Sequence, residues 1–342
     1  MRYLLILDAD LNRVFTGALP EIAATELRLV AEARLPGALT DVERVIDGRT
    51  RSLRFDAEVD PADVAPLAGQ LSASAALFVS AGEDLWRPVP IEEHLTYGTE
   101  LATTQRYRGK TNERLARAML NVALATAGID PAAPSGAVLD PMCGRGTTLN
   151  WALAYGLDAI GLDVDRGDLE HHATFVEQWA KRARLPHKLD RFRPGNAEGR
   201  VATLRVAADR ARFKADRGQT VTTFTGDAGD PPTAMTKRTV DAVVVDLPYG
   251  VQHRGAGGGT SGPGDDGRDT VGLLARVLPV WRRLLRSGGS LCVAWNTRTG
   301  SRRDVDRALV EAGFAPITVR GGFSMRHTVD ASIDRDVIVA TR

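Results

Sequence analysis

The sequence is poor in cysteine, in lysine and in long apolar runs, and these shortages exclude several classes of protein. Its 342 residues include only two cysteines, Cys143 and Cys292, too few for a disulfide framework or a cysteine-rich metal site. No segment approaches the ~18 consecutive apolar residues that a transmembrane helix needs. The first residues lack the apolar stretch and cleavage site of a signal peptide. We therefore expect a cytoplasmic protein with no membrane segment and no bound metal.

Lysine is scarce, at 5 residues against 39 arginines, and the charges are unevenly distributed along the chain. Residues 1–95 hold 9 basic and 16 acidic residues, whereas residues 171–220 hold 12 and 5. A basic segment within a balanced chain favours contact with a polyanion such as RNA. Basic residues that only coat solvated helices would give the same counts, so composition leaves both interpretations open.

The hydrophobic pattern divides the chain into two units. Residues 1–95 predict a small acidic α/β domain that ends in a linker near Pro88 and Pro90. Residues 96–342 begin with a helix expected over 111–127, with Thr111 as its N-cap. Short apolar strands then alternate with helical segments, which implies parallel strands joined by right-handed crossovers. The expected strands are residues 137–139, 159–162, 221–224, 240–245, 290–295, 317–319 and 337–340.

These elements predict an α/β fold with a doubly wound, seven-stranded, mostly parallel sheet and an antiparallel C-terminal hairpin. Such a sheet resembles that of class I, Rossmann-like methyltransferases, and a plain nucleotide-binding sheet is the alternative. The basic segment 171–220 lengthens the connection between the second and third strands, so we interpret it as a helical insertion. Residues 251–270 are rich in glycine and predict a mobile loop, either a lid or a surface loop without a role.

Three of the expected strands lead into aspartates, at the edge where open parallel sheets bind ligands. Asp140 opens the run 140–148, DPMCGRGTT, in which Gly144 and Gly146 let the backbone approach a ligand closely. A helix then begins at Thr147, and its first amides suit the carboxylate of S-adenosylmethionine. Asp140 would face the ammonium group of that cofactor, or a water molecule bound to it.

Further acids follow the next two strands. Asp163 could accept hydrogen bonds from the ribose hydroxyls, with Asp165 as a rival, and Asp227 could receive the adenine amine. Each acid could instead cap a helix or a turn. The predicted cofactor-binding residues are Asp140, Pro141, Cys143, Gly144, Gly146, Thr147, Asp163, Val164, Asp227 and Ala228.

A second motif, DLPYG at residues 246–250, follows the fourth expected strand. It resembles the Asp/Asn-Pro-Pro-Tyr motif of methyltransferases that act on exocyclic amines of bases. Asp246 and the carbonyl group of Leu247 would accept the amine hydrogens. Pro248 would stiffen the turn, and Tyr249 would stack on the base, which is worth about 1–3 kcal/mol. A plain β-turn is the alternative. Methylation at carbon 5 of a pyrimidine would need a cysteine beside the base, and this motif has none.

Together the two motifs resemble the THUMP-associated tRNA guanosine methyltransferases, over roughly residues 96–342. The resemblance implies S-adenosylmethionine as cofactor and the 2-amino group of a guanine in tRNA as the methylated site. Leu247 stands where the family has proline, and residues 1–95 are shorter and more acidic than an RNA-binding THUMP module. We therefore expect residues 1–95 to be a degenerate THUMP-like or accessory domain, and residues 171–220 to contact the RNA. DNA or a small aromatic amine is the alternative substrate.

Overall fold

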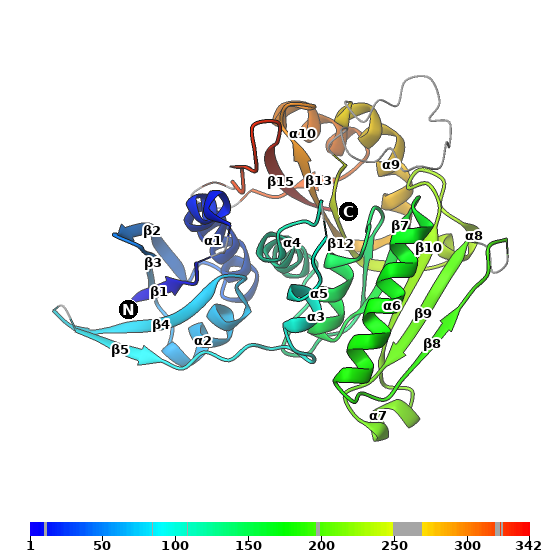
Figure 1. Cartoon of the computed structure of the whole chain (residues 1–342). Coiled ribbons are helices and arrows are strands. Elements are labelled where there is room, and N and C mark those ends of the chain that lie inside the picture. The colour runs from blue at the N-terminus through cyan, green and yellow to red at the C-terminus, as the bar shows by residue number, and fades with distance from the viewer. Residues whose placement is uncertain are drawn as a thin grey trace.

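The computed structural model contains two sheets, a small one near the N-terminus and a large one in the rest of the chain (Figure 1). The structure describes residues 1–9, 12–83, 85–107, 109–195, 199–248, 269–318, 322 and 324–342. The predicted catalytic residue Tyr249 lies outside these ranges, as does the predicted mobile loop apart from its last two residues.

The small sheet has five antiparallel strands in the order β2-β3-β1-β4-β5. The elements of this unit are β1 (Arg2–Leu7), α1 (Arg13–Arg34), β2 (Leu39–Asp47), β3 (Thr50–Ala57), α2 (Pro61–Gln70), β4 (Ser74–Gly82) and β5 (Leu85–Val89). At the expected linker, Pro90 lies in a segment without helix or strand, whereas Pro88 still belongs to β5. This strand lies at the edge of the sheet, where a residue without a backbone N–H is tolerated.

The large sheet has the order β13-β15-β12-β11-β6-β7-β10-β9-β8, with β14 paired to β15. Strands β6, β7, β10, β11 and β12 run parallel to their neighbours within this group. Strand β15 runs antiparallel to both β12 and β13, as expected for the C-terminal hairpin. The strands are β6 (Ala137–Asp140), β7 (Asp158–Asp163), β8 (His187–Arg191), β9 (Arg200–Val206), β10 (Gln219–Thr225), β11 (Val240–Asp246), β12 (Leu285–Asn296), β13 (Ala315–Pro316), β14 (His327–Thr328) and β15 (Asp334–Thr341).

The predicted count of seven strands is wrong, since the described part of this sheet has ten. Two of the added strands, β8 and β9, come from the basic segment that the sequence suggested was a helical insertion. In β9, Ala202, Leu204 and Val206 are buried and alternate with more exposed residues, a period of two that fits a strand packed beneath a helix. The count of charges concealed this alternation.

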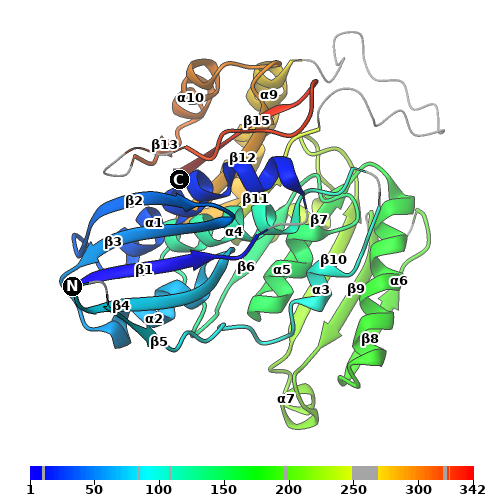
Figure 2. The same ribbon diagram turned by 60° about the vertical axis from the view of Figure 1, so that its left-hand side comes forward.

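Helices cover both faces of the large sheet (Figure 2). Strand β11 shows the consequence, because Ala242 and Val244 enter one apolar core while Val243 and Val245 enter the other. A strand buried on both faces reads as a continuous apolar run, as this one does. The helices of this unit are α3 (Glu100–Thr103), α4 (Glu113–Thr126), α5 (Thr147–Tyr155), α6 (Arg166–Arg182), α7 (Arg210–Lys214), α8 (Thr233–Thr236), α9 (Thr270–Leu284) and α10 (Arg302–Glu311).

The small unit packs against the large one through α1, which lies along α4 (Figures 1 and 2). Leu27 of α1 and Leu120 of α4 belong to one continuous buried core. A buried hydrogen bond of 2.6 Å also crosses the interface, from the amide nitrogen of Asn121 to the carboxylate of Glu26. The N-terminal unit is therefore fixed beside the helix that leads into the large sheet.

Candidate active site

The order of the large sheet reverses beside β6. The chain proceeds from β6 to β7 and β10 on one side, then returns to β11 and β12 on the other. Such a switch point leaves a crevice outside the carboxyl ends of the strands. Strands β6, β7 and β11 end at Asp140, Asp163 and Asp246. The structure therefore brings these three predicted acids to adjacent strand ends.

Asp140 is deeply buried at this edge, with 4% of its surface exposed. The pKa of its carboxyl group is raised to about 7, mainly by burial and to a smaller extent by the nearby charges of Asp163 and Asp246. Hydrogen bonds from the Met142 amide and the Thr148 side chain act in the opposite direction. A positive charge placed here would be stabilised, since it would offset the desolvation of this carboxylate.

The turn after β6 depends on its two glycines. Both have positive φ angles, +48° at Gly144 and +78° at Gly146, a region that other residues rarely adopt. The amide of Gly144 donates a hydrogen bond of 2.7 Å to Oδ2 of Asp163, which ties the turn to the end of β7. Cys143 is buried and packs where Gly161 has no side chain, and burial raises the pKa of its thiol well above the ordinary value.

The acids after β7 have separate roles. Asp163 accepts hydrogen bonds from the Gly144 amide on one oxygen and from the Asp165 amide, at 2.9 Å, on the other. Asp165 is the N-cap of α6, and its side chain accepts from the amides of Gly167 and Asp168. Val164, between them, is 71% exposed. Asp165 therefore stabilises a helix, while Asp163 lies beside the glycine turn.

Asp227 lies two residues beyond β10, next to the buried Ala228. Its carboxylate accepts a hydrogen bond of 2.7 Å from the Gly229 amide and forms an ion pair with Arg276 of α9. Burial opposes ionisation of Asp227, but the Arg276 ion pair and the Gly229 hydrogen bond hold its pKa below the ordinary value. An adenine amine at this position would share the carboxylate with Arg276.

Asp246 ends β11 and is held by two side chains from distant segments. Oδ2 accepts a hydrogen bond of 2.7 Å from the hydroxyl of Thr111 and lies 3.2 Å from Nη2 of Arg335. The Asp246 and Arg335 side chains are only 14% and 6% exposed. Thr111 is not the helix N-cap that the sequence suggested, because Asn112 caps α4 and leaves the Thr111 hydroxyl for Asp246.

Leu247 stands where the usual motif has proline, and its contacts explain this difference. Its amide donates a hydrogen bond of 2.9 Å to the carbonyl oxygen of Ala294 on β12, which a proline could not make. Its side chain is buried in the core beneath α9. Leu247 therefore fixes the backbone between Asp246 and the partly buried Pro248.

Tyr107 is a residue at this site that sequence reasoning did not select. Its hydroxyl group lies 3.1 Å from that of Thr147, the first residue of α5, and the Arg145 guanidinium stacks over its ring. Burial raises the pKa of Tyr107 to about 12. Its position in a polar and aromatic stretch before α4 was the only signal in the sequence.

Comparison with known proteins gives this arrangement a family context. Residues 102–258 match the RMKL-like methyltransferase domain family, a range that includes both motifs and the strands that carry them. The protein is a methyltransferase. Its two motifs, at residues 140–148 and 246–250, resemble those of the THUMP-associated tRNA guanosine methyltransferases, which use S-adenosylmethionine.

The solved structures that are similar to this methyltransferase share little of its sequence. TrmN from Thermus thermophilus is 14% identical, with 100% of both chains covered and a TM-score of 0.46. A methyltransferase from Pyrococcus furiosus is 11% identical over 69% of this chain and 87% of its own, with a TM-score of 0.42. A TehB-like S-adenosylmethionine-dependent methyltransferase from Corynebacterium glutamicum is 15% identical over 60% and 80%, with a TM-score of 0.35. No curated protein sequence matches the chain.

The residues of the glycine turn fit S-adenosylmethionine, the cofactor of this methyltransferase. A Cβ atom at Gly144 would meet no atom within 4 Å, so the backbone of the turn faces open space at the crevice. Helix α5 begins directly after the turn, and the first amides of a helix favour a carboxylate. The buried carboxyl group of Asp140 lies at the same strand end and suits the cofactor's ammonium group.

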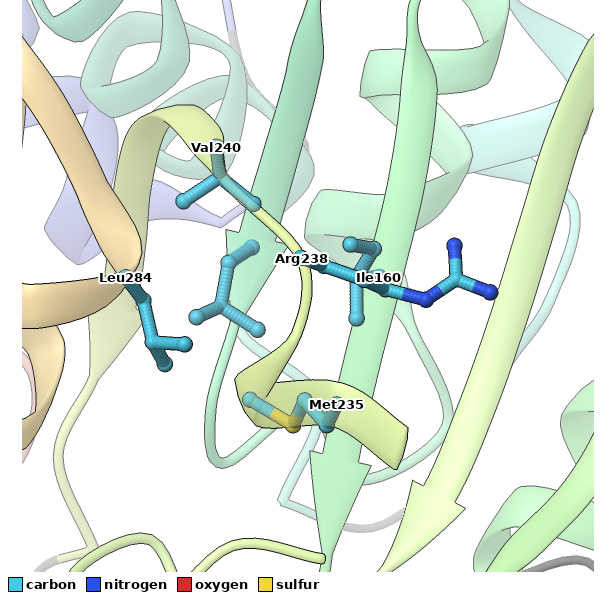
Figure 3. Close-up of a pocket in the computed structure, with 6 residues that line it drawn as sticks. Ile160, Met235, Arg238, Val240 and Leu284 are labelled. Carbon is cyan, nitrogen blue, oxygen red and sulfur yellow. The ribbon is translucent and has the colours of Figure 1, made fainter. Parts of the chain in front are cut away.

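Figure 3 shows a pocket that is separate from this site. It lies near the start of β11, whereas Asp246 is at the end of that strand. Its lining is mostly apolar: Leu139, Ile160, Met235, Arg238, Val240 and Leu284. Within the described ranges, no group of three or more His, Cys, Asp or Glu residues could hold a metal ion. The same part of the chain contains no helix with the length and apolar character to cross a membrane.

Proposed function

We propose that this methyltransferase modifies an exocyclic amine of a nucleic-acid base, and that its substrate is a guanine in tRNA. The observation that carries the proposal is the pairing of β11 with β6, in which Ala242 lies beside Val138 and Val243 beside Leu139. Adjacent strands are about 4.8 Å apart. Asp246, the proposed amine acceptor, is the last residue of β11 and therefore lies beside the end of β6, which leads into the glycine turn.

The chemistry follows from the weakness of an aromatic amine as a nucleophile. Its lone pair is delocalised into the ring, so the nitrogen must be turned toward a tetrahedral form before it can attack. Asp246 and the carbonyl oxygen of Leu247 would accept hydrogen bonds from the two N–H groups of the amine and favour that form. S-adenosylmethionine supplies an electrophilic methyl group on its sulfonium. The chain's contribution is to align the amine with that methyl group, which can account for much of the rate increase.

The other predicted site residues have proposed roles in the same frame. Asp140 would bind the ammonium group and the first amides of α5 the carboxylate of the cofactor. Asp163 would accept from the ribose hydroxyls, since a carboxylate has room for about four hydrogen bonds. Asp227 would receive the adenine amine. Tyr249 would stack on the base, and Pro248 would restrict the turn that presents it.

We also propose that the basic segment 171–220 contacts the RNA, with its cations divided between two edges of the sheet. Arg200 pairs with Phe224 near the carboxyl end of β10, and the Arg191 side of the β8–β9 pair lies at that same edge. The cations of α7 and the end of α6 lie at the opposite edge. Contacts near the modified base would therefore come from Arg191 and Arg200, and more distant phosphates would reach α7. Residues 1–95 would serve as an accessory domain that supports the catalytic one.

A methylation assay with matched variants tests the proposed function. tRNA from a strain that lacks this protein is incubated with enzyme and S-adenosylmethionine, and its nucleosides are measured by mass spectrometry. Wild type should produce N2-methylguanosine. Asp246→Ala should lose turnover by roughly 100-fold or more while binding of S-adenosylmethionine is kept. The control is Asp241→Ala, which removes an acid at the other end of β11 that pairs with Arg286 and accepts the Ala137 amide.

The outcomes separate the alternatives. Normal turnover by Asp246→Ala would refute the proposed role of that residue. Methylation of duplex DNA or of a small aromatic amine, with none of tRNA, would refute the RNA substrate. Binding of tRNA through several arginines should also weaken steeply as salt rises, because bound phosphates release their counterions.

A further inference from the structure

Arg335 reaches the proposed catalytic acid from two strands away. It lies on β15 opposite Asn296 of β12, and β12 separates β15 from β11. Its side chain crosses this strand and places Nη2 3.2 Å from Oδ2 of Asp246. Only 6% of the side chain is exposed. Burial of an unpaired guanidinium is energetically costly, and the contact with Asp246 compensates for that cost.

Two groups bind one oxygen of Asp246 from different directions. The Thr111 hydroxyl donates to Oδ2 from the segment before α4, and the Arg335 guanidinium approaches the same atom from β15. A charge-assisted contact together with a neutral hydrogen bond restrains both the position and the rotation of the carboxylate. Both contacts come from outside the two sequence motifs.

Arg335 is itself held in place by the N-terminal unit. Its partner on β14 is His327, whose ring meets that of Phe15 of α1 edge-on at 5.5 Å. Close by, the hydroxyl of Thr25 on α1 donates a hydrogen bond of 2.7 Å to the carbonyl oxygen of Ser324. Helix α1 thus braces the short segment that packs beside Arg335.

We propose that Arg335 is a positioning residue that orients Asp246 toward the substrate amine, with Thr111 as the second restraint. This inference rests on the proposed function, because it needs Asp246 to be the amine acceptor. In this role Arg335 acts through Asp246 rather than by its own contact with the substrate or the cofactor. Its effect is on the geometry of the acceptor, so it should influence the rate of methyl transfer and leave cofactor affinity unchanged.

The test compares Arg335→Met and Arg335→Lys with wild type in the tRNA methylation assay. We expect Arg335→Met to lower kcat by roughly 100-fold, since small misplacement of a reacting group has effects of this size. The KM for S-adenosylmethionine should stay within about twofold, and Arg335→Lys should recover part of the loss because it restores a cation. The control is Arg302→Met, which removes an ion pair of 3.0 Å with Asp336, the next residue on β15. The control should keep its kcat.

A double variant separates failure of this inference from failure of the proposed function. If Arg335 acts only through Asp246, Asp246→Ala with Arg335→Met should be no slower than Asp246→Ala alone. If Asp246→Ala is inactive but Arg335→Met turns over normally, the inference is overturned while the proposed function stands. An active Asp246→Ala overturns both. An Arg335→Met loss that appears equally in Arg302→Met would mean a structural role and would also overturn the inference.

Thermal unfolding provides a readout that needs no substrate. Asp246→Ala should lower Tm because it leaves the buried guanidinium without this carboxylate. Adding Arg335→Met should recover part of that loss, which is the signature of a coupled pair. Additive losses of Tm in the double variant would show that the two side chains are not coupled and would overturn the inference.

Discussion

The ring of His172 stands directly against Gly146, so that a Cβ atom at position 146 would lie 2.5 Å from Cδ2 of the imidazole. His172 is fully buried on α6 and is hydrogen-bonded to Asn150 of α5 at 3.1 Å. Burial lowers its pKa to about 4, so the ring is neutral near pH 7. The glycine turn of the cofactor site is therefore formed against a buried, uncharged ring.

The first prediction concerns this contact. Gly146→Ala should destabilise the protein by about 1–3 kcal/mol, because it combines a positive φ with a clash against a buried ring. Gly144→Ala is the control, since its φ is also positive but no atom lies within 4 Å. Denaturant unfolding should show the larger loss at position 146. Equal losses in the two variants would contradict the importance of His172.

The second prediction separates two neighbouring acids. Asp163→Ala should weaken S-adenosylmethionine binding roughly tenfold or more, because it removes the proposed ribose contact and the tether to Gly144. Asp165→Ala should instead cost about 1 kcal/mol of stability through loss of a helix cap, with cofactor affinity kept. Isothermal titration calorimetry measures both affinities. Unchanged binding in Asp163→Ala would transfer the ribose role to Asp165.

The third prediction is a pH dependence. The folded-state pKa of Asp140 is about 7, above its ordinary value of 3.8, so the folded state binds a proton more tightly than the unfolded state does. Its contribution to stability is complete below about pH 4 and is lost as pH rises toward 7. The difference in Tm between wild type and Asp140→Asn should therefore shift against wild type over this range. A difference that is flat from pH 4 to pH 8 would contradict the raised pKa.

The fourth prediction concerns the residue that departs from the family motif. Leu247→Pro should be less stable than Leu247→Ala by about 0.5–1.5 kcal/mol, since only the proline loses the N–H bond to Ala294. Both variants lose the buried leucine side chain, so their difference isolates the backbone. Thermal unfolding of the two variants side by side measures it. A proline variant that matched the alanine variant would mean that this bond contributes nothing.

The sequence predicted the strand-end acids well because each follows a short apolar run. Asp140, Asp163 and Asp246 each end a buried strand, and the order of such strands places their ends at one edge. The first motif also placed glycines at a turn, where the structure gives both of them positive φ angles. These features are local, so one segment at a time was sufficient to predict them.

The contacts between distant segments could not be predicted in this way. Thr111 and Arg335 meet Asp246 only after the sheet has formed, and neither carries a motif. Thr111 is a residue type that often caps helices, but Asn112, an equally good cap, follows it and takes that position. Strands β8 and β9 were not predicted, because the many charges of their segment obscure the alternation of buried and exposed residues.

The apolar core that α1 shares with α4 has a consequence for how the chain unfolds. Leu27 and Leu120 are buried in this same core, so separating the two units would expose apolar surface on both at once. Loss of the N-terminal unit would expose one side of α4. Thr111, which donates a hydrogen bond to Asp246, lies just before this helix. The two sheets should therefore melt as a single cooperative body, and a fragment that starts near residue 96 would be prone to aggregate.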